Sequence, residues 1–141
     1  MALFTLRLCA LLSAAVLCIS AGPLPGPVPG PMPVDPNSEG VREAADYATV
    51  HFNLGSHDKY IYKVTAVLDV QVQIVGGVKY TMDVELGKTR CENGKTPNLE
   101  ACALFHTPAE ARSLRCHFVV LSDPLTDQDT ILQNQCQPLP Q

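Results

Sequence analysis

The feature that most constrains the fold is a pair of long alternating segments that meet at two adjacent glycines. Residues 60–75 and 78–89 are rich in β-branched residues and alternate apolar with polar side chains, which is typical of half-buried strands. Gly76 and Gly77 interrupt the pattern and favour a tight turn between antiparallel strands. The sequence therefore predicts a long hairpin. Its inward positions are expected to be Val64, Ala66, Leu68, Val70, Val72 and Ile74, then Val78, Tyr80, Met82, Val84 and Leu86.

A helix is predicted before this hairpin and two shorter strands after it. Asn37 or Ser38 can cap a helix over about residues 39–54, and Gly55 ends it. Its apolar residues fall on one stripe: Val41, Ala44, Ala45, Ala48 and Phe52. Strands are expected over 114–122 and 130–136, after a loop-rich excursion at 91–112. The predicted fold class is therefore α+β, with one helix packed across a four- to five-stranded antiparallel sheet.

The first 36 residues differ in composition from this core. A weakly basic start leads into an unbroken apolar run over residues 8–19, and small residues follow it. This is the order of a secretory signal peptide, and the run is too short to span a bilayer. Residues 22–36 alternate proline with glycine and apolar residues, so they cannot form a helix or a central strand. We expect a signal peptide at 1–21, a Pro/Gly-rich arm at 22–36 and a folded domain at 37–141, in a secreted, extracellular protein.

Composition and charge narrow the range of partners. Apolar residues make up 46% of the 141 residues and charged residues 17%, which is enough apolar material to bury a core. The net charge is -4, and no basic run occurs. This argues against nucleic-acid binding and against binding to an anionic membrane surface. The expected partners are proteins or small molecules.

The cysteines predict disulfides. Once the signal peptide is removed, an even set remains in the C-terminal half: Cys91, Cys102, Cys116 and Cys136. In an oxidising compartment this set predicts two bridges, each worth ~3 kcal/mol. Three pairings are possible, and the sequential one closes two short loops without crossing. A zinc site of Cys91, Cys102, His106 and Cys116 is the competing interpretation, but its spacing lacks a paired CxxC.

No catalytic constellation stands out. The histidines occur at separate places, and the neighbours Cys116 and His117 would point to opposite faces of a strand. We therefore expect no enzyme, no cofactor and no metal site. The distinctive segment is Gln73 to Gly77, QIVGG, at the hairpin tip. Either it is a binding tip, whose glycines allow close backbone approach, or Ile74 and Val75 are simply the last strand residues before the turn.

The sequence resembles the secreted cystatins that carry two disulfides. QIVGG matches the first-loop pattern QxVxG of that family, and the cysteines occur in the family order. Further segments agree with the family pattern: GPM at 30–32, EGVREAADYA at 39–48, VELGKTRC at 84–91 and PNLEAC at 97–102. The resemblance covers the whole chain beyond the Pro-rich arm.

This resemblance implies a reversible, tight-binding inhibitor of papain-like cysteine proteases of the cathepsin type. In the family, a wedge of three segments plugs the protease cleft without presenting a scissile bond. The expected protease-binding residues here come from the N-terminal segment, the first loop and the second loop: Val28, Gly30, Gln73, Ile74, Val75, Gly76, Gly77, Pro124 and Leu125. A monomer is expected, with a domain-swapped dimer as the alternative.

Two positions depart from the family pattern. Leu125 stands where the family has a tryptophan, and Pro29 falls where many members have a hinge glycine. Gly30 can serve as the hinge instead. The alternative function is a non-inhibitory extracellular binding module with the same fold.

Overall fold

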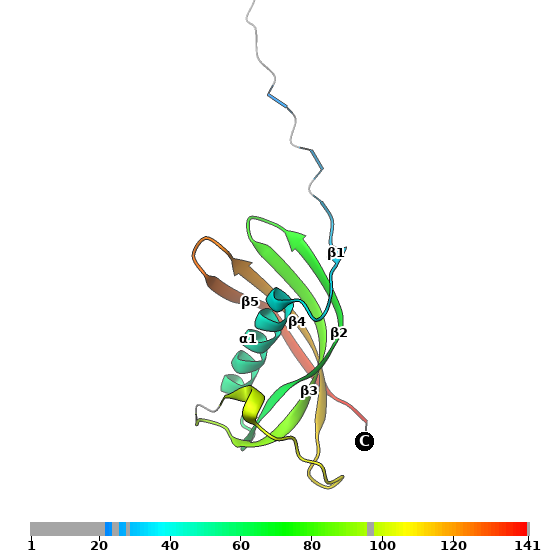
Figure 1. Cartoon of the computed structure of the whole chain (residues 1–141), viewed down its shortest axis with the longest axis vertical. Coiled ribbons are helices and arrows are strands. Elements are labelled where there is room, and N and C mark those ends of the chain that lie inside the picture. The colour runs from blue at the N-terminus through cyan, green and yellow to red at the C-terminus, as the bar shows by residue number, and fades with distance from the viewer. Residues whose placement is uncertain (1–21, 24–25, 28, 96–97, 141) are drawn as a thin grey trace, which may run out of the picture.

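A computed structural model describes residues 22–23, 26–27, 29–95 and 98–140. The expected signal peptide lies outside this part of the chain. Within it, one helix and a five-stranded antiparallel sheet account for the regular structure, together with a short 3₁₀ turn. Figure 1 shows the sheet curving around the helix. The α+β prediction is confirmed. In the described residues no helix is long and apolar enough to cross a membrane.

The helix α1 spans Glu39–Gly55 and forms where the apolar stripe predicts it. Val41, Ala44, Ala45 and Ala48 are buried, and Phe52 packs at the margin of the core. Ser38 occupies the N-cap position, but its side chain makes no capping hydrogen bond. Three alanines on the buried face let the helix approach the sheet closely, because their side chains are small.

The strands follow one another across the sheet in chain order. They are β1 (Met32–Pro33), β2 (Tyr60–Ile74), β3 (Val78–Glu92), β4 (Ser113–Asp123) and β5 (Gln128–Pro138). The excursion between β3 and β4 contains the 3₁₀ turn η1 (Leu99–Ala101). The fully buried centre of the core comes from β3 and β4, with Met82, Val84, Leu86, Phe118 and Val120 all at 0% exposure. The inward positions predicted for the second long segment are thus confirmed at its centre.

The predicted inward face of β2 is wrong in the middle of the strand. Val64 and Val70 contact the core as expected, but Val67 packs there between them and Leu68 is 46% exposed. Register shifts relative to β3 fall between Val64 and Ala66 and between Val67 and Asp69. Each such bulge adds a residue, so the alternation changes phase twice. The chain thereby keeps valines inward with a spacing of three.

The arm contributes an edge strand that the sequence analysis did not predict. Met32 pairs with Val72, and Pro33 pairs with Gln71. A proline is tolerated in β1 because this strand lies at the edge, where one side of its backbone needs no partner. The prediction that the arm forms no central strand is therefore confirmed.

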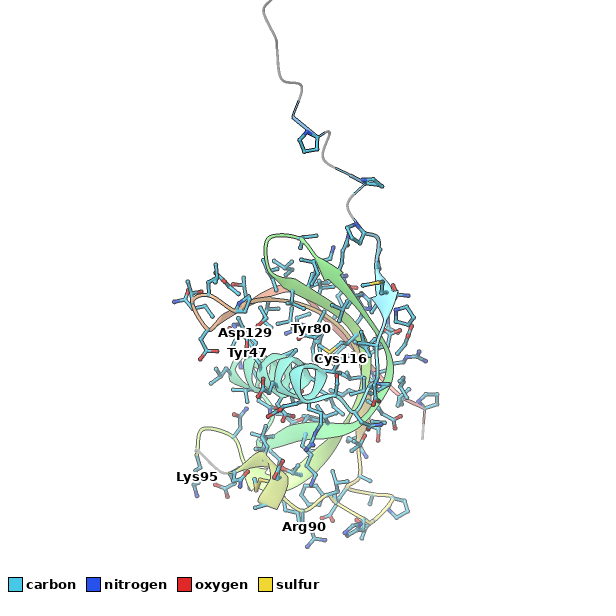
Figure 2. All side chains as sticks on the ribbon, turned by 45° about the horizontal axis from the view of Figure 1, so that its top comes forward. Tyr47, Tyr80, Arg90, Lys95, Cys116 and Asp129 are labelled. Carbon is cyan, nitrogen blue, oxygen red and sulfur yellow. A yellow bond between two sulfur atoms is a disulfide. The ribbon has the colours of Figure 1, made fainter. Side chains whose placement is uncertain are left out.

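Two disulfides join the cysteines in the sequential pairing, Cys91 with Cys102 and Cys116 with Cys136. Every cysteine of the zinc alternative is engaged in one of them, so that alternative is excluded. Figure 2 shows Cys116 beside the helix, within the curve of the sheet. Cys102 and Cys116 are almost fully buried, at 1% and 0% exposure.

If the expected signal peptide is cleaved, Cys9 and Cys18 leave with it, and we expect the mature chain to carry no free thiol. Alkylation of the native protein without a reductant should leave its intact mass unchanged. After reduction, the mass should rise by four alkyl groups, one for each cysteine in the two disulfides. An alkyl adduct on the unreduced protein would contradict the two-bridge scheme.

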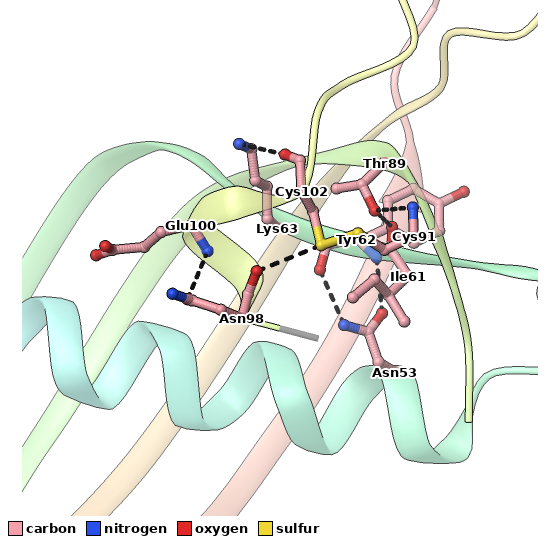
Figure 3. Close-up of a disulfide and its surroundings, with 9 residues drawn as sticks. All are labelled: Asn53, Ile61, Tyr62, Lys63, Thr89, Cys91, Asn98, Glu100 and Cys102. Carbon is pink, nitrogen blue, oxygen red and sulfur yellow. Dashed lines mark hydrogen bonds between the residues drawn. A yellow bond between two sulfur atoms is a disulfide. The ribbon is translucent and has the colours of Figure 1, made fainter. Parts of the chain in front are cut away.

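The junction between α1 and β2 is held by side chains that imitate backbone pairing. The amide of Asn53 donates to the carbonyl of Tyr62 and accepts from its N–H, both at 2.9 Å (Figure 3). Asn53 is only 5% exposed and Tyr62 is equally buried. The last turn of the helix therefore takes the place of a neighbouring strand for this residue of β2.

A second set of contacts fixes the loop after the helix. The carboxylate of Asp58 accepts from the Lys88 ammonium at 2.9 Å and from the Tyr62 hydroxyl at 3.2 Å. Burial raises the pKa of Asp58, but the hydrogen bonds from Lys88 and from the Tyr60 N–H outweigh it and hold the pKa below its ordinary value. Burial and the neighbouring Asp58 raise the pKa of Tyr62 to about 12. The side chain of Asn93 donates to carbonyls on the same loop and so closes this network.

Candidate functional site

Three segments far apart in the sequence meet at one end of the sheet. They are the β2–β3 turn, the β4–β5 turn and the N-terminal segment that leads into β1 (Figure 1). The register explains the meeting. Val78 pairs with Ser122, which sets the two turns side by side, and Met32 pairs with Val72, which brings the N-terminal segment alongside the first turn. We call this end of the molecule the three-segment edge.

The first turn presents apolar side chains on a tightly bent backbone. The Val75 N–H donates to the Gly77 carbonyl at 2.9 Å, and Gly76 has a φ of +78°. Glycine suits that left-handed conformation because a Cβ would strain it. Ile74 is 53% exposed and Val75 43% exposed. The tip therefore offers apolar surface in a fixed shape.

Gly77 connects the first turn to the second. A Cβ on Gly77 would lie 2.8 Å from the Ser122 carbonyl oxygen and 3.3 Å from the Leu121 side chain. A side chain there would push the end of β4 away, because a backbone oxygen cannot swing aside as the end of a flexible side chain can. The second glycine of QIVGG thus serves to bring the two turns together.

The second turn is organised by the residue that precedes its proline. The Asp123 carboxylate accepts from the Leu125 N–H at 2.9 Å, and Asp127 adopts a left-handed φ of 54°. Hydrogen bonds from the Leu125 N–H and the Thr126 hydroxyl lower the pKa of Asp123. Leu125 is 93% exposed, so it does not fold back onto the sheet. The backbone of this turn is fixed while its apolar side chain is displayed.

The N-terminal segment reaches the same end along β1. If the register of Met32 and Pro33 continues for two residues, Gly30 lies level with Ile74. Val28, expected from the sequence to bind, lies outside the described residues. Met32 is 51% exposed beside the first turn and was not among the expected residues. The sequence signal that could have identified Met32 is an apolar residue between two prolines, Pro31 and Pro33.

The geometry thus brings together the expected residues that the structure describes, from Gly30 through Gln73–Gly77 to Pro124 and Leu125. Met32, Ile74, Val75 and Leu125 expose apolar surface along this edge. An edge of this kind is suited to binding a groove on another protein, with the apolar side chains buried at the centre of the contact. Elsewhere in the described residues, the His117 ring lies 2.8 Å from the Asp83 carboxylate (Nδ1 to Oδ1). The neighbouring Cys116 points to the opposite face of β4 and is held in a disulfide.

A helix embraced by a five-stranded meander, with two hairpin turns and the N-terminal segment at one end, defines a cystatin-like protein. The family model for the cystatin domain matches residues 29–124. The chain belongs to the cystatin family, and its two disulfides agree with the type 2 cystatins. It is therefore a member of a family of protease inhibitors and not of enzymes.

Relatives of known sequence support this assignment. The chain is 36% identical to "Cystatin" of Gallus gallus over 104 residues, which cover 74% of each protein. It is 37% identical to "Cystatin-C" of Saimiri sciureus over 118 residues, covering 84% of this chain and 80% of that protein.

Solved structures agree on the fold. The crystal structure of dimeric human cystatin F superposes with a TM-score of 0.77 at 25% identity, covering 86% of this chain and 97% of that one. Mouse fetuin-B in complex with crayfish astacin gives a TM-score of 0.70 at 17% identity. Here 79% of this chain corresponds to 36% of fetuin-B, and the likeness is one of fold alone.

Proposed function

We propose that the protein is a secreted, reversible and tight-binding inhibitor of papain-like cysteine proteases of the cathepsin type. The three-segment edge enters the active-site cleft as a wedge. The observation that supports this best is the exposed apolar tip of the first turn, held rigid by Gly76 and joined to the second turn through Gly77. The same proposal includes a signal peptide at 1–21, an arm at 22–36 and the inhibitory domain at 37–141.

A wedge of this shape blocks a protease without being cut. Proteases bind their substrates as extended strands, whereas the hydrogen bond from Val75 to the Gly77 carbonyl keeps this backbone bent. The bend cannot place a peptide bond in line for attack. Because both turns are already ordered, binding costs little conformational entropy, and the apolar contact is expressed as affinity.

The test is a titration of papain, with its active sites counted beforehand, against the mature protein. We expect inhibition at a one-to-one ratio, recovery of activity when a competing substrate is added in excess, and an inhibitor of unchanged mass. Papain that stays fully active at saturating concentrations would overturn the proposal.

The alternative, a non-inhibitory binding module, is favoured by two residues, Leu125 and Pro29, that differ from the family pattern. The fetuin-B structures show the same fold bound to crayfish astacin and to human meprin beta. Astacin belongs in the same titration for that reason. A chain that binds neither enzyme and inhibits neither would favour the alternative. Inhibition of astacin with papain unaffected would overturn both and point to a different class of target protease.

A further prediction concerns the second turn. Leu125→Trp should tighten binding to papain by ~1 kcal/mol, because a tryptophan ring buries more area and is the side chain most enriched among interface anchors. The gain should appear mainly as slower dissociation. Since Leu125 is 93% exposed, the larger ring meets no neighbour and the melting temperature should stay the same. Unchanged dissociation with a lower melting temperature would show that this turn contributes packing and not inhibition.

A further inference from the structure

The two edges of the sheet are protected very differently. At one edge, β1 is short, and prolines at positions 31 and 33 remove backbone donors that another strand would need. At the other edge, β5 runs for eleven residues. Within the described residues no strand pairs with its outer side. Long free edges are the places where sheets add further strands.

The pairing between β4 and β5 shows which backbone groups of β5 face outward. Cys116 and Cys136 have their Cα atoms 4.0 Å apart, the short spacing of a pair that does not exchange backbone hydrogen bonds. The Leu139 N–H donates to the Ser113 carbonyl, which confirms the phase three residues further on. By alternation, Gln135 and Gln137 bond to β4, while Asn134 and Cys136 direct their N–H and C=O groups to the free side.

The helix covers only the first part of this edge. The Tyr47 hydroxyl donates to the Asp129 carbonyl at 2.8 Å, and Figure 2 shows these two residues together. Further along, helix and strand separate around a groove of about 370 Å³, lined by His51, Phe52, Gly55, Ser56, Asn134 and Cys136. The part of β5 from Gln133 to Gln137 therefore has an open flank, bounded by Pro138, which has no N–H to direct to the free side. We call it the open half of β5.

The open half of β5 is complementary to itself. Its sequence, QNQCQ, contains no charged residue and no proline. Two copies placed antiparallel bring no like charges together, and no lysine or arginine blocks the approach. Glutamine and asparagine amides both donate and accept hydrogen bonds, so each can pair with its own kind across a two-fold axis.

We propose that two copies of this protein associate through the open half of β5, antiparallel about Gln135. Asn134 of each copy exchanges both backbone hydrogen bonds with Cys136 of the other. Gln135 then faces its own counterpart at the short-spaced position, and Gln133 faces Gln137. The contact is isologous, so it closes at the dimer and joins the two sheets into one.

This dimer leaves the three-segment edge free. Gln135 lies seven residues along the strand from Gln128, about 24 Å from the second turn at the usual rise of a strand. Both copies can therefore engage a partner at once, and the proposal does not depend on what that partner is. Because the contact is small, we expect a reversible dimer with a dissociation constant of about 10 to 1,000 μM.

The test is sedimentation of the mature, oxidised protein across that concentration range. We expect the weight-average mass to rise from monomer towards dimer and to fall again on dilution. Gln135→Lys and Gln135→Glu should each raise the dissociation constant at least tenfold, because like charges then meet at the two-fold axis. An equal mixture of the two variants should dimerise again. Gln71→Lys, an exposed glutamine of β2, is the matched control and should dimerise like the unaltered protein.

Each other outcome overturns the proposal. A wild-type chain that stays monomeric throughout the range has no such contact. A dimer that persists in both Gln135 variants uses another surface, and one that survives dilution for hours points to exchange of a structural element between copies. Circular dichroism of each variant excludes unfolding as the cause of lost association.

Discussion

Val75→Asp should weaken inhibition of papain at least about tenfold, with the circular dichroism spectrum unchanged. Val75 stands at the tip of the first turn, 43% exposed, so an aspartate there is solvated in the free protein and costs no stability. In the complex the same position is expected to be the most desolvated part of the wedge. Burying an unpaired carboxylate at such an anchor costs about 2 kcal/mol or more. The measurement is the inhibition constant, with dissociation rates recorded in parallel.

The matched control is Leu68→Asp. Leu68 is 46% exposed on the same strand, so the substitution makes the same chemical change at almost the same exposure. It lies near the middle of β2, away from the tip, and should leave inhibition unaltered. Equal inhibition by both variants would show that QIVGG is not the contact surface. Equal loss would show that added negative charge, and not position, weakens binding.

Asn53→Ala should lower the free energy of unfolding by about 2 to 4 kcal/mol, which corresponds to a melting temperature about 10 to 20 °C lower. The substitution leaves the N–H and C=O of the buried Tyr62 without their partners at the end of α1. A buried backbone group that loses its only partner costs more than an average hydrogen bond contributes. Denaturant unfolding with both disulfides intact is the measurement.

Asn98→Ala serves as the control for this variant. The Asn98 side chain accepts from the Glu100 N–H at 3.2 Å, but the residue is exposed and water can replace it. The cost should stay below about 1 kcal/mol. A similarly small effect for Asn53→Ala would mean that water enters the junction and satisfies Tyr62, so that the amide is not what holds helix and strand together.

The sequence predicted the parts of the fold that follow one local rule. A helical stripe of small apolar residues marked the buried face of α1, and strict alternation marked β3 to within three residues of its end. In both elements the residues that contact the core are set by the period of the backbone alone.

The phase of β2 could not be predicted because it depends on the neighbouring strand. Nothing in the stretch Val64 to Asp69 distinguishes an alternating strand from one with two bulges, since valines occur at both phases. Asn53 escaped notice for a related reason. An asparagine near a helix end resembles a solvated residue, and only the fold shows that Tyr62 lies opposite it.

The candidate site was recognised from short sequence motifs, and the structure shows how its three segments are held together. QIVGG marked the first turn, but the contact of Gly77 with Ser122 joins residues 45 positions apart in the sequence and has no local signature. Met32 belongs to the site because β1 pairs with β2. This pairing was not predicted, because the prolines of the arm argued against a strand.

The order of the strands has a consequence for how the chain acquires its covalent structure. From β2 onward each strand lies beside the next one along the chain, so Cys116 and Cys136 are brought face to face by formation of a single hairpin. Cys91 and Cys102 are eleven residues apart and shorten the connection between β3 and β4, the longest one after β2. Each native bridge thus closes a contact that forms early. Both alternative pairings include one longer bridge, Cys91 to Cys136 over 45 residues or Cys102 to Cys136 over 34, and therefore a larger loss of chain entropy. Oxidative refolding of this protein should therefore pass through few scrambled intermediates, with isomerase-dependent reshuffling contributing little to its rate.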